Sequence, residues 1–365
     1  MRTPSTLMTL FSTSSTPSIL HQNMKMNSSE QPSTLLNSST WPPISSSGLG
    51  LSCLSMTFGA VSNLTALGIL VKSRVRFRRQ SKTPFLLLTV ALLMADFGGH
   101  MIPGAFVMYL YKQEEKQPTF CQIFGACMVF FGLCPLLFGC AMAMERCVAI
   151  AKPFYHATVI TVTHAQRVVL FLASLALMLA VLPLFAVGTY SAQFPGTWCF
   201  LPIHGPQSTA DTSLALAFSG LGLTALTLSL LCNILSGVVL LKARINRHNV
   251  NAKLKARCTC CPSSASTSSV FWSLEVEMMA QLAAITVVSC VCWSPFLIHI
   301  LVMKLNRSPR DSTDVPDGLT LLCLRMASWN QVLDPWIYIL LRRAVISRAC
   351  CAFYPHRPRV TADGS

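Results

Sequence analysis

The stretch Val168–Val187, VVLFLASLALMLAVLPLFAV, contains 20 residues and no charged side chain. A helix that crosses a bilayer needs about 20 mostly apolar residues, so this stretch predicts a membrane-spanning helix. Six further stretches are also mostly apolar and long enough to cross, and half of them have no charged residue: Leu49–Val71, Pro84–Tyr109, Cys121–Ile150, Leu214–Leu241, Met278–Met303 and Leu319–Leu341. The sequence therefore predicts an all-α membrane protein whose seven-transmembrane helix bundle occupies residues 48–341.

The composition of the chain supports a membrane protein over the other broad classes. Of its 365 residues, 11% are charged and 52% are hydrophobic, and the mean hydropathy is +0.54. A disordered chain would be less hydrophobic and more charged, and a soluble globular protein could not cover its surface with so few charges. The formal net charge is +15, but nucleic-acid-binding proteins are rich in charge, so we expect a lipid bilayer as partner and no nucleic acid.

The basic residues predict the orientation of the chain. Twenty of the 28 Lys and Arg residues fall in four segments: Lys72–Lys82, Arg146–Arg167, Lys242–Glu277 and residues 342–365. Loops that stay in the cytoplasm are enriched in Lys and Arg. We therefore expect an extracellular N-terminus and a cytoplasmic C-terminus in a multi-pass protein of the plasma membrane.

The two terminal segments differ in composition. Residues 1–47 are rich in Ser, Thr and Pro, which is typical of a disordered tail. If this tail lies outside, Asn27 and Asn37 are acceptors for glycosylation. Residues 342–365 begin with a basic amphipathic run, which predicts a short eighth helix and a short cytoplasmic tail. The adjacent Cys350 and Cys351 are candidates for palmitoylation.

Besides Glu145 near the inner end of the third span, two acidic residues lie inside predicted spans, Asp96 in the second and Asp334 in the seventh. A charge at membrane depth costs about 2.5–3.5 kcal/mol on insertion scales, so such residues usually face the bundle interior. We expect Asp96, Asn63, Asn330 and Asp334 to form one polar cluster. It would hold water or a sodium ion, or it would consist only of hydrogen bonds between helices.

The inner halves of three spans carry candidate switch residues. Proline inside a span weakens the helix locally, so Pro295 and Pro335 predict a bendable sixth and a bendable seventh helix. The third span ends in Glu145-Arg146-Cys147. An ion pair between Glu145 and Arg146 would break when a cytosolic partner enters, whereas the alternative is two residues that only snorkel at the interface.

Two cysteines are expected on the oxidising side of the membrane. Cys121 begins the third span at its outer end, and Cys199 lies in the second outer loop. Disulfides form and persist in oxidising compartments, so a Cys121–Cys199 bridge is favoured.

Arg325 is a basic residue inside a predicted span. It lies six residues into the seventh span, about 9 Å below the outer surface at about 1.5 Å per residue. Asp96 and Asp334 lie deeper, and Glu145 lies at the opposite face. We therefore expect Arg325 to bind an anionic ligand through a bidentate carboxylate contact, with snorkelling to the outer headgroups as the alternative.

Seven residues of this chain match signature positions of the rhodopsin-like G-protein-coupled receptors, and they occur in the same order: Asn63, Asp96, Arg146, Trp293, Pro295, Pro335 and Tyr338. The chain resembles that family from Leu49 to Phe353. It departs at Cys147 and Asp334, where the family usually has Tyr and Asn, and it lacks the usual fourth-span Trp and fifth-span Pro. These departures resemble the prostanoid branch, as do residues 196–200 (GTWCF) and 324–331 (LRMASWNQ).

Within that branch, residues 130–137 (FFGLCPLL) and 194–199 (FPGTWC) are most similar to prostaglandin E receptors of the first subtype. The prostaglandin F and thromboxane receptors are also similar. The resemblance implies prostaglandin E as the ligand and a heterotrimeric G protein of the calcium-mobilising Gq class as the partner. We expect no enzyme activity and no cofactor, apart from the sodium ion that the polar cluster near Asp96 would hold in the first of its two interpretations.

The resemblance also implies roles for individual residues. The ligand carboxylate would bind Arg325, Tyr111 and Thr197. A flexible acyl chain needs an apolar slot, for which Met128, Phe131 and Trp293 are candidates, with plain core packing as the alternative. The switch and G-protein coupling would use these residues: Glu145, Arg146, Asp96, Pro295, Asp334, Pro335 and Tyr338.

Two other classes of protein remain alternatives. A seven-span transporter often has internal repeats, and the two halves of this chain show no convincing repeat. An intramembrane enzyme would need clustered catalytic residues. His100 and His299 lie on separate outer half-spans with no obvious nucleophile.

Overall fold

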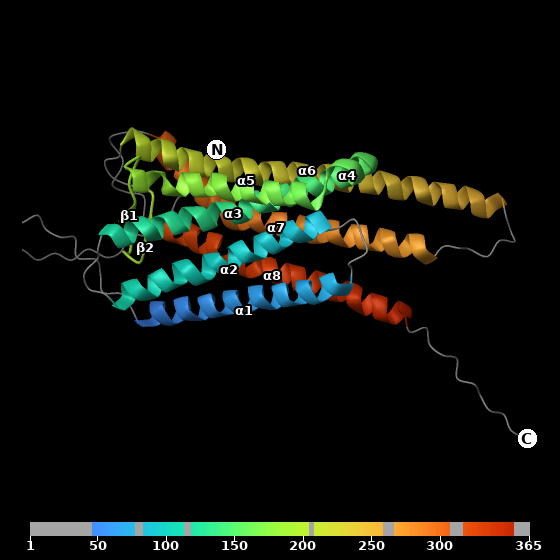
Figure 1. The fold of residues 1–365 in the computed structure, drawn as a ribbon, viewed down its shortest axis with the longest axis horizontal. Helices are drawn as coiled ribbons and strands as arrows, with labels where there is room; N and C mark the ends of the chain where they lie inside the picture. The colour runs from blue at the N-terminus through green and yellow to red at the C-terminus, as the bar shows by residue number, and fades with distance from the viewer. Residues whose placement is uncertain are drawn as a thin grey trace, which may run out of the picture. The chain divides into compact units, whose positions relative to one another are not determined.

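The computed structural model describes residues 46–76, 83–112, 118–203, 208–257, 266–306 and 317–353, with side chains over a somewhat smaller part of the helices. Seven long helices lie in these ranges: α1 (Ser46–Arg76), α2 (Thr83–Lys112), α3 (Pro118–Ala151), α5 (Val162–Val181), α6 (Thr209–Arg257), α7 (Ser266–Leu305) and α8 (Asp317–Phe353). Each predicted span falls largely on one of them, which confirms the all-α helix bundle (Figure 1).

Six of the long helices, α1, α2, α3, α5, α6 and α7, are long and apolar enough to cross a membrane by length and composition. Helix α8 is not among them. Its central part includes four polar residues that lower its hydropathy: Arg325, Asn330, Gln331 and Asp334. Asn330, Gln331 and Asp334 are buried, as expected for polar residues at membrane depth, which usually face the bundle interior.

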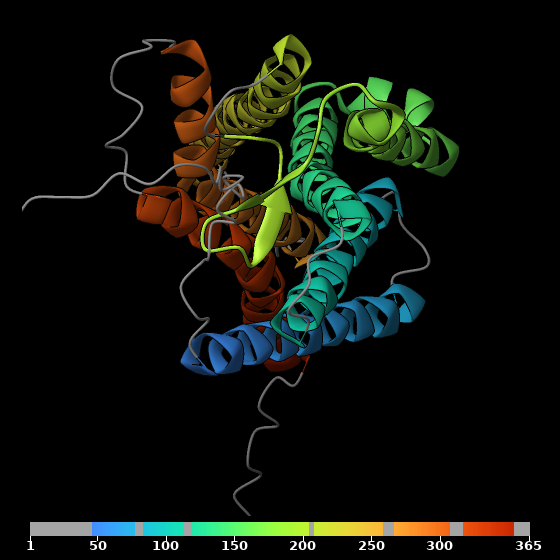
Figure 2. The same cartoon turned by 90° about the vertical axis from the view of Figure 1, so that its left-hand side faces the viewer.

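Short elements distinguish the two ends of the bundle. The hairpin of β1 (Ser191–Gln193) and β2 (Trp198–Phe200) is antiparallel, with Ala192 paired to Cys199. Figure 2 shows this hairpin lying across the middle of one end of the bundle, which we call the hairpin end. The short helix α4 (Pro153–Val159) lies at the other end, the α4 end (Figure 1).

The fourth predicted span begins and ends earlier than expected. Helix α5 starts at Val162, where the side chain of the N-cap residue Thr161 accepts a hydrogen bond from the backbone N–H of His164. Its α-helical part stops at Val181, because Pro183 has no N–H to donate to a carbonyl four residues earlier. Residues 182–185 continue as a 3₁₀ helix, η1 (Leu182–Phe185).

The segment Lys242–Glu277, expected as a loop, is largely helical. Helix α6 continues to Arg257 and α7 begins at Ser266, while residues 258–265 lie outside the described residues. The sequence AKLKAR at residues 252–257 consists of strong helix formers, which explains the extension of α6. Similarly, the helical part of the expected eighth helix, residues 342–353, is continuous with the seventh span in α8.

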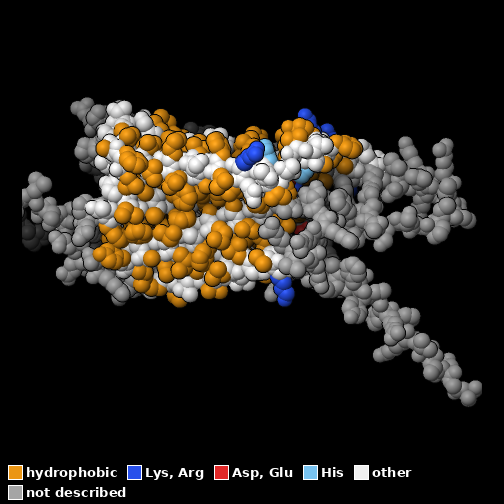
Figure 3. All heavy atoms as spheres, in the orientation of Figure 1, with side chains coloured by type: hydrophobic (Ala, Val, Ile, Leu, Met, Phe, Trp, Pro, Cys, Tyr) orange, Lys and Arg blue, Asp and Glu red, His pale blue; other side chains and the backbone are white. Residues whose placement is uncertain are grey.

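Helix α3 lies inside the bundle and contacts α2, α5, α6, α7 and both strands. Its buried residues Phe124, Leu133 and Met142 belong to the main hydrophobic core. Many large apolar side chains are exposed instead, and Figure 3 shows them covering much of the visible face of the bundle. Such an apolar exterior suits a bilayer, where lipid replaces water as the solvent.

Candidate functional site

The β-hairpin is covalently attached to α3. The structure joins Cys121, near the start of α3, to Cys199 in β2, with their Cα atoms 5.5 Å apart. This confirms the disulfide predicted from the positions of the two cysteines. Trp198, Cys199 and Phe200 are all buried, so both faces of β2 are covered. The hairpin therefore forms a lid packed into the hairpin end of the bundle.

Beneath this lid, an aromatic cluster connects β2 to the helices. The ring of Phe200 lies 5.2 Å from that of Phe218 on α6 and 5.6 Å from that of Phe296 on α7, measured between centroids. Phe296 in turn lies 6.3 Å from Trp293, edge to face. A Cβ atom on Gly132 would lie only 3.1 Å from the Trp293 ring, so the missing side chain at this position of α3 leaves room for the indole.

Polar contacts hold the lid from two more helices. The ammonium of Lys304, near the end of α7, donates to the carbonyl oxygens of Pro202 at 2.5 Å and Ile203 at 3.3 Å, and its residue is only 5% exposed. At the start of α6, one carboxylate oxygen of Asp211 accepts from the backbone N–H of Thr189 at 2.7 Å. The lid is therefore connected to α3, α6 and α7.

Tyr190 fastens the segment that leads into the hairpin. Its hydroxyl donates to the carbonyl oxygen of Ala180 on α5 at 2.7 Å. Burial raises the pKa of Tyr190 above its ordinary value, so the hydroxyl keeps its proton and remains a donor. The ring lies against Gly125 of α3, where an added Cβ would be 2.4 Å from the Tyr190 ring.

Arg325 lies on an exposed part of α8, and makes no hydrogen bond or ion pair with any residue in the described part of the chain. Less than two turns closer to the start of α8, Thr320 Oγ1 lies 2.9 Å from Nε2 of His299 on α7. The guanidinium is therefore available to an anion, although its exposure is also compatible with snorkelling to headgroups.

The other predicted ligand residues lie on several elements. Met128 and Phe131 are half-buried on α3, Trp293 is buried on α7, and Thr197 is half-buried in the turn that precedes β2. Tyr111 lies in α2, but its side chain lies outside the described residues. Of these residues, Trp293 packs against α3 at Gly132, where the indole lies next to the bare backbone.

The predicted polar cluster is split into separate contacts. Asn330 donates to Asp334 at 3.0 Å within α8, and Asn63 donates to the backbone carbonyl of Gln331 at 3.1 Å. Both carboxylate oxygens of Asp96 are buried and have no hydrogen-bond partner among the described residues. Unpartnered oxygens of this kind suit a cation or a shared proton, so a sodium ion beside Asp96 stays a prediction.

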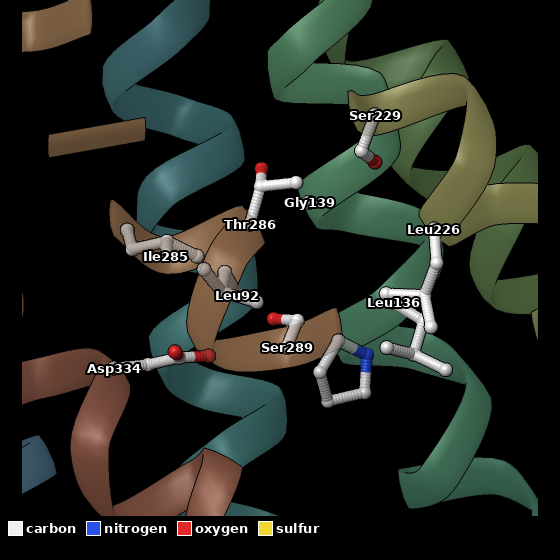
Figure 4. Close-up of a pocket in the computed structure, with 10 residues that line it drawn as sticks. Leu92, Leu136, Gly139, Leu226, Ser229, Ile285, Thr286, Ser289 and Asp334 are labelled. Carbon is white, nitrogen blue, oxygen red and sulfur yellow. The ribbon is translucent and has the colours of Figure 1, made fainter. Parts of the chain in front are cut away.

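A small cavity adjoins the acidic residue of α8. Figure 4 shows the Asp334 carboxylate pointing towards Ser289 of α7, with Thr286 and Ser229 further along the cavity wall. The space open to a water-sized molecule is about 10 Å³, near the smallest volume that holds one water. None of the predicted ligand residues lines this cavity, so it is not the expected ligand site.

At the α4 end, Glu145 and Arg146 form the predicted ion pair. Nε and Nη2 of Arg146 lie 2.5 and 2.6 Å from the two carboxylate oxygens of Glu145. Nε2 of His156, on α4, lies 2.7 Å from Oε1 of the same carboxylate. All three residues are buried, and the Arg146 guanidinium lies 4.9 Å from the centre of the Phe85 ring.

The sequence of this chain matches known receptors over most of its length. The family described as "7 transmembrane receptor (rhodopsin family)" matches residues 68–338. The dog (Canis lupus familiaris) prostaglandin E2 receptor EP1 subtype is 42% identical over 355 residues, which cover 88% of this chain and 86% of the relative. This chain belongs to the prostanoid branch of the rhodopsin family.

A second relative and a solved structure are also similar to this chain, the latter in fold. The human (Homo sapiens) prostaglandin F2-alpha receptor is 38% identical over 347 residues, covering 91% of each chain. The crystal structure of squid rhodopsin matches with a TM-score of 0.67 at 14% identity, over 84% of this chain and 82% of that one. Together with its apolar helices, this membership makes the receptor a multi-pass plasma-membrane protein, and its relatives are receptors rather than enzymes or transporters.

Sequence reasoning missed several contacts of the receptor. His156 lies eleven residues beyond Glu145, and no spacing rule for a single helix predicts their contact. Neither the apolar pattern nor the excess of basic residues predicts a role for Lys304 or for the aromatic residues Phe200, Phe218 and Phe296. Three adjacent buried residues in β2 give no alternating pattern that would have predicted their packing.

Proposed function

We propose that the receptor binds prostaglandin E through the carboxylate of the ligand and activates a Gq-class G protein. The single observation that carries the ligand proposal is Arg325, an exposed guanidinium on α8 without an ion pair or hydrogen bond to the described residues. A guanidinium matches a carboxylate bidentately, which a lysine cannot do. The 42% identity to prostaglandin E2 receptors supports prostaglandin E over other carboxylate lipids.

In this proposal the hairpin end faces the outside and the α4 end faces the cytoplasm. The excess of basic residues in segments at the α4 end supports this orientation. The disulfide at the hairpin end supports it independently, because the extracellular side is oxidising. The ligand head would bind Arg325 with Tyr111 and Thr197, and its apolar chain would lie beside Met128, Phe131 and Trp293.

Activation then follows as a population shift. A ligand that binds better when α7 and α8 are in the active arrangement favours that arrangement. Pro295 and Pro335 provide the bendable points, and Asp96, Asp334 and Tyr338 form the packed polar interior through which the change passes. At the α4 end, the contact between Glu145 and Arg146 would open to admit the G protein.

The test uses two variants, Arg325→Ala and Arg325→Lys, with prostaglandin E2 as the free acid and as its methyl ester. We expect Arg325→Ala to weaken binding of the acid about 10- to 100-fold, because a charge-assisted contact is lost. Binding of the ester should change less than about threefold, since it has no charge to lose. Arg325→Lys should recover only part of the affinity. The matched control is Lys242→Ala, an exposed cation at the α4 end.

Unchanged binding of the acid in Arg325→Ala, at normal surface expression, would refute the carboxylate contact. Competition between prostaglandins E2 and F2-alpha decides the ligand, since relatives of both kinds are similar to the receptor. Calcium and cyclic AMP recorded in parallel decide the coupling. A cyclic AMP response without calcium release would refute the Gq proposal.

A further inference from the structure

Two prolines inside helices each free a backbone carbonyl at the middle of the bundle. In an α-helix, the N–H of a residue donates to the carbonyl four residues earlier, and proline has no N–H. Pro135 lies inside α3, so the carbonyl of Phe131 lacks its usual donor. Pro335 lies inside α8, so the carbonyl of Gln331 lacks its donor in the same way.

Both freed carbonyls accept hydrogen bonds from side-chain amides of other helices. Nε2 of Gln331 donates to the Phe131 oxygen at 3.2 Å, and Nδ2 of Asn63 donates to the Gln331 oxygen at 3.1 Å. Gln331 therefore takes part in both contacts. Its backbone carbonyl is the one that Pro335 leaves without a helical donor in α8. Its side-chain amide supplies the donor that Pro135 removes from α3.

A glycine on a fourth helix makes this arrangement possible. A Cβ atom on Gly99 of α2 would lie 2.5 Å from Nε2 of Gln331, closer than a real side chain could approach. The Gln331 amide thus reaches α3 over a position of α2 that has no side chain. Gln331 is only 7% exposed, so water does not readily replace the amide as a donor to Phe131.

We propose that Gln331 is a positioning residue that couples the proline kink of α8 to the proline kink of α3. When α8 rearranges at Pro335, the Gln331 amide transmits the movement to the turn of α3 that carries Phe131. This inference deepens the proposed function, since Phe131 and Arg325 are proposed ligand residues on those two helices. The contact itself exists without ligand, so it can be tested separately.

The test is a double-mutant cycle between Gln331→Met and Pro135→Ala. Methionine keeps the length and apolar stem of glutamine but cannot donate, so Gln331→Met leaves a buried carbonyl without a partner. Pro135→Ala restores an N–H that can donate to Phe131 within α3, and the Gln331 amide then becomes dispensable. Gln281→Met is the matched control, because Gln281 is also 7% exposed and has no hydrogen bond to the described residues.

Three properties of the full-length receptor are measured: the thermal midpoint without ligand, basal G-protein nucleotide exchange, and exchange at saturating prostaglandin E2, all per receptor. We expect Gln331→Met to lower the midpoint by about 2–4 °C and to reduce stimulated exchange severalfold. In the Pro135→Ala background, both losses should shrink to less than half. A purely structural role would lower the midpoint in the parent receptor without lowering the stimulated exchange per receptor.

An equal effect of Gln331→Met in both backgrounds would overturn the proposal, as would no effect in the parent receptor. A receptor that responds to another prostanoid but not to prostaglandin E2 refutes the ligand proposal alone, and the cycle is then run with that prostanoid. If no prostanoid stimulates the receptor, the midpoint and basal exchange decide the coupling. Effects of Gln331→Met on both properties that shrink in the Pro135→Ala background support it, and an effect on neither property or on the midpoint alone refutes it.

Discussion

His156 Nε2 lies 2.7 Å from Glu145 Oε1, and this contact joins α4 to the ion pair at the end of α3. Glu145 thus has two partners, Arg146 from its own helix and His156 from the following one. In the proposed orientation the G protein approaches this end of the bundle. The position of α4 and the state of the ion pair are therefore connected through a single carboxylate.

Removing the His156 imidazole should separate α4 from the Glu145–Arg146 ion pair. We expect His156→Ala to raise basal G-protein nucleotide exchange severalfold, because a hydrogen bond to a charged group contributes about 1.5–3 kcal/mol and here favours the closed arrangement. Exchange is measured in membranes without ligand and normalised to receptor number. The control is His164→Ala, an exposed histidine in α5. Unchanged basal exchange in His156→Ala would mean that the contact does not restrain the switch.

Lys304 should control how long a ligand stays under the lid. Lys304→Met keeps the apolar stem but removes the donors to the Pro202 and Ile203 carbonyls, so the hairpin should loosen from α7. We expect dissociation of radiolabelled prostaglandin E2 to become about 3- to 10-fold faster, with a smaller change in association. Lys242→Met, at the other end of the bundle, serves as the control. A dissociation rate equal to that of the parent receptor would show that the Lys304 contacts do not retain the ligand under the lid.

The disulfide should contribute strongly to stability, since it closes a segment of 78 residues. A loop of that length corresponds to about 4–5 kcal/mol in the chain-entropy estimate. We expect Cys121→Ser and Cys199→Ser each to impair surface expression and ligand binding. The double variant should be no worse than either single one, because both remove the same bond. Cys53→Ser, which changes a free cysteine of α1, should have little effect on either measurement. Full function in either single variant would contradict a structural role for the bridge.

Close packing between α1 and α2 predicts a difference between two glycines of α1. A Cβ atom on Gly59 would lie 2.3 Å from the buried ring of His100, whereas a Cβ on Gly68 would meet nothing within 4 Å. Gly59→Ala should therefore destabilise the receptor by about 1–3 kcal/mol, seen as a lower thermal midpoint. Gly68→Ala should be neutral or slightly stabilising, because alanine favours helix. Equal midpoints for the two variants would argue against the packing of His100 on Gly59.

The pattern of the sequence was sufficient to predict each helix of the bundle but not where each helix ends. Apolar stretches reveal the membrane spans because transfer into lipid depends on composition within one segment. The extension of α6 to Arg257 lies beyond the apolar part, where helix propensity decides instead. The shortened α-helical part of α5 follows from Pro183, which lies inside the predicted span.

Among the site residues, prediction succeeded where chemistry and position within one segment were enough. The Cys121–Cys199 bridge and the Glu145–Arg146 pair are of this kind. The polar cluster was only partly predicted. Asn330 and Asp334 are in contact four residues apart on one helix, but Asn63 binds the backbone of Gln331 rather than a carboxylate. A backbone carbonyl freed by a proline is not visible as a polar residue in the sequence.

By itself, therefore, the sequence determined the number of spans, the expected orientation and the arginine on which the ligand proposal rests, because each depends on local composition or spacing. Tertiary structure alone decided which side chain donates to the carbonyls freed by Pro135 and Pro335. It brought Gln331 to Phe131, two residues 200 positions apart, over the bare backbone of Gly99. Buried carbonyls need donors, and only the packing of the helices determines which donor is within reach.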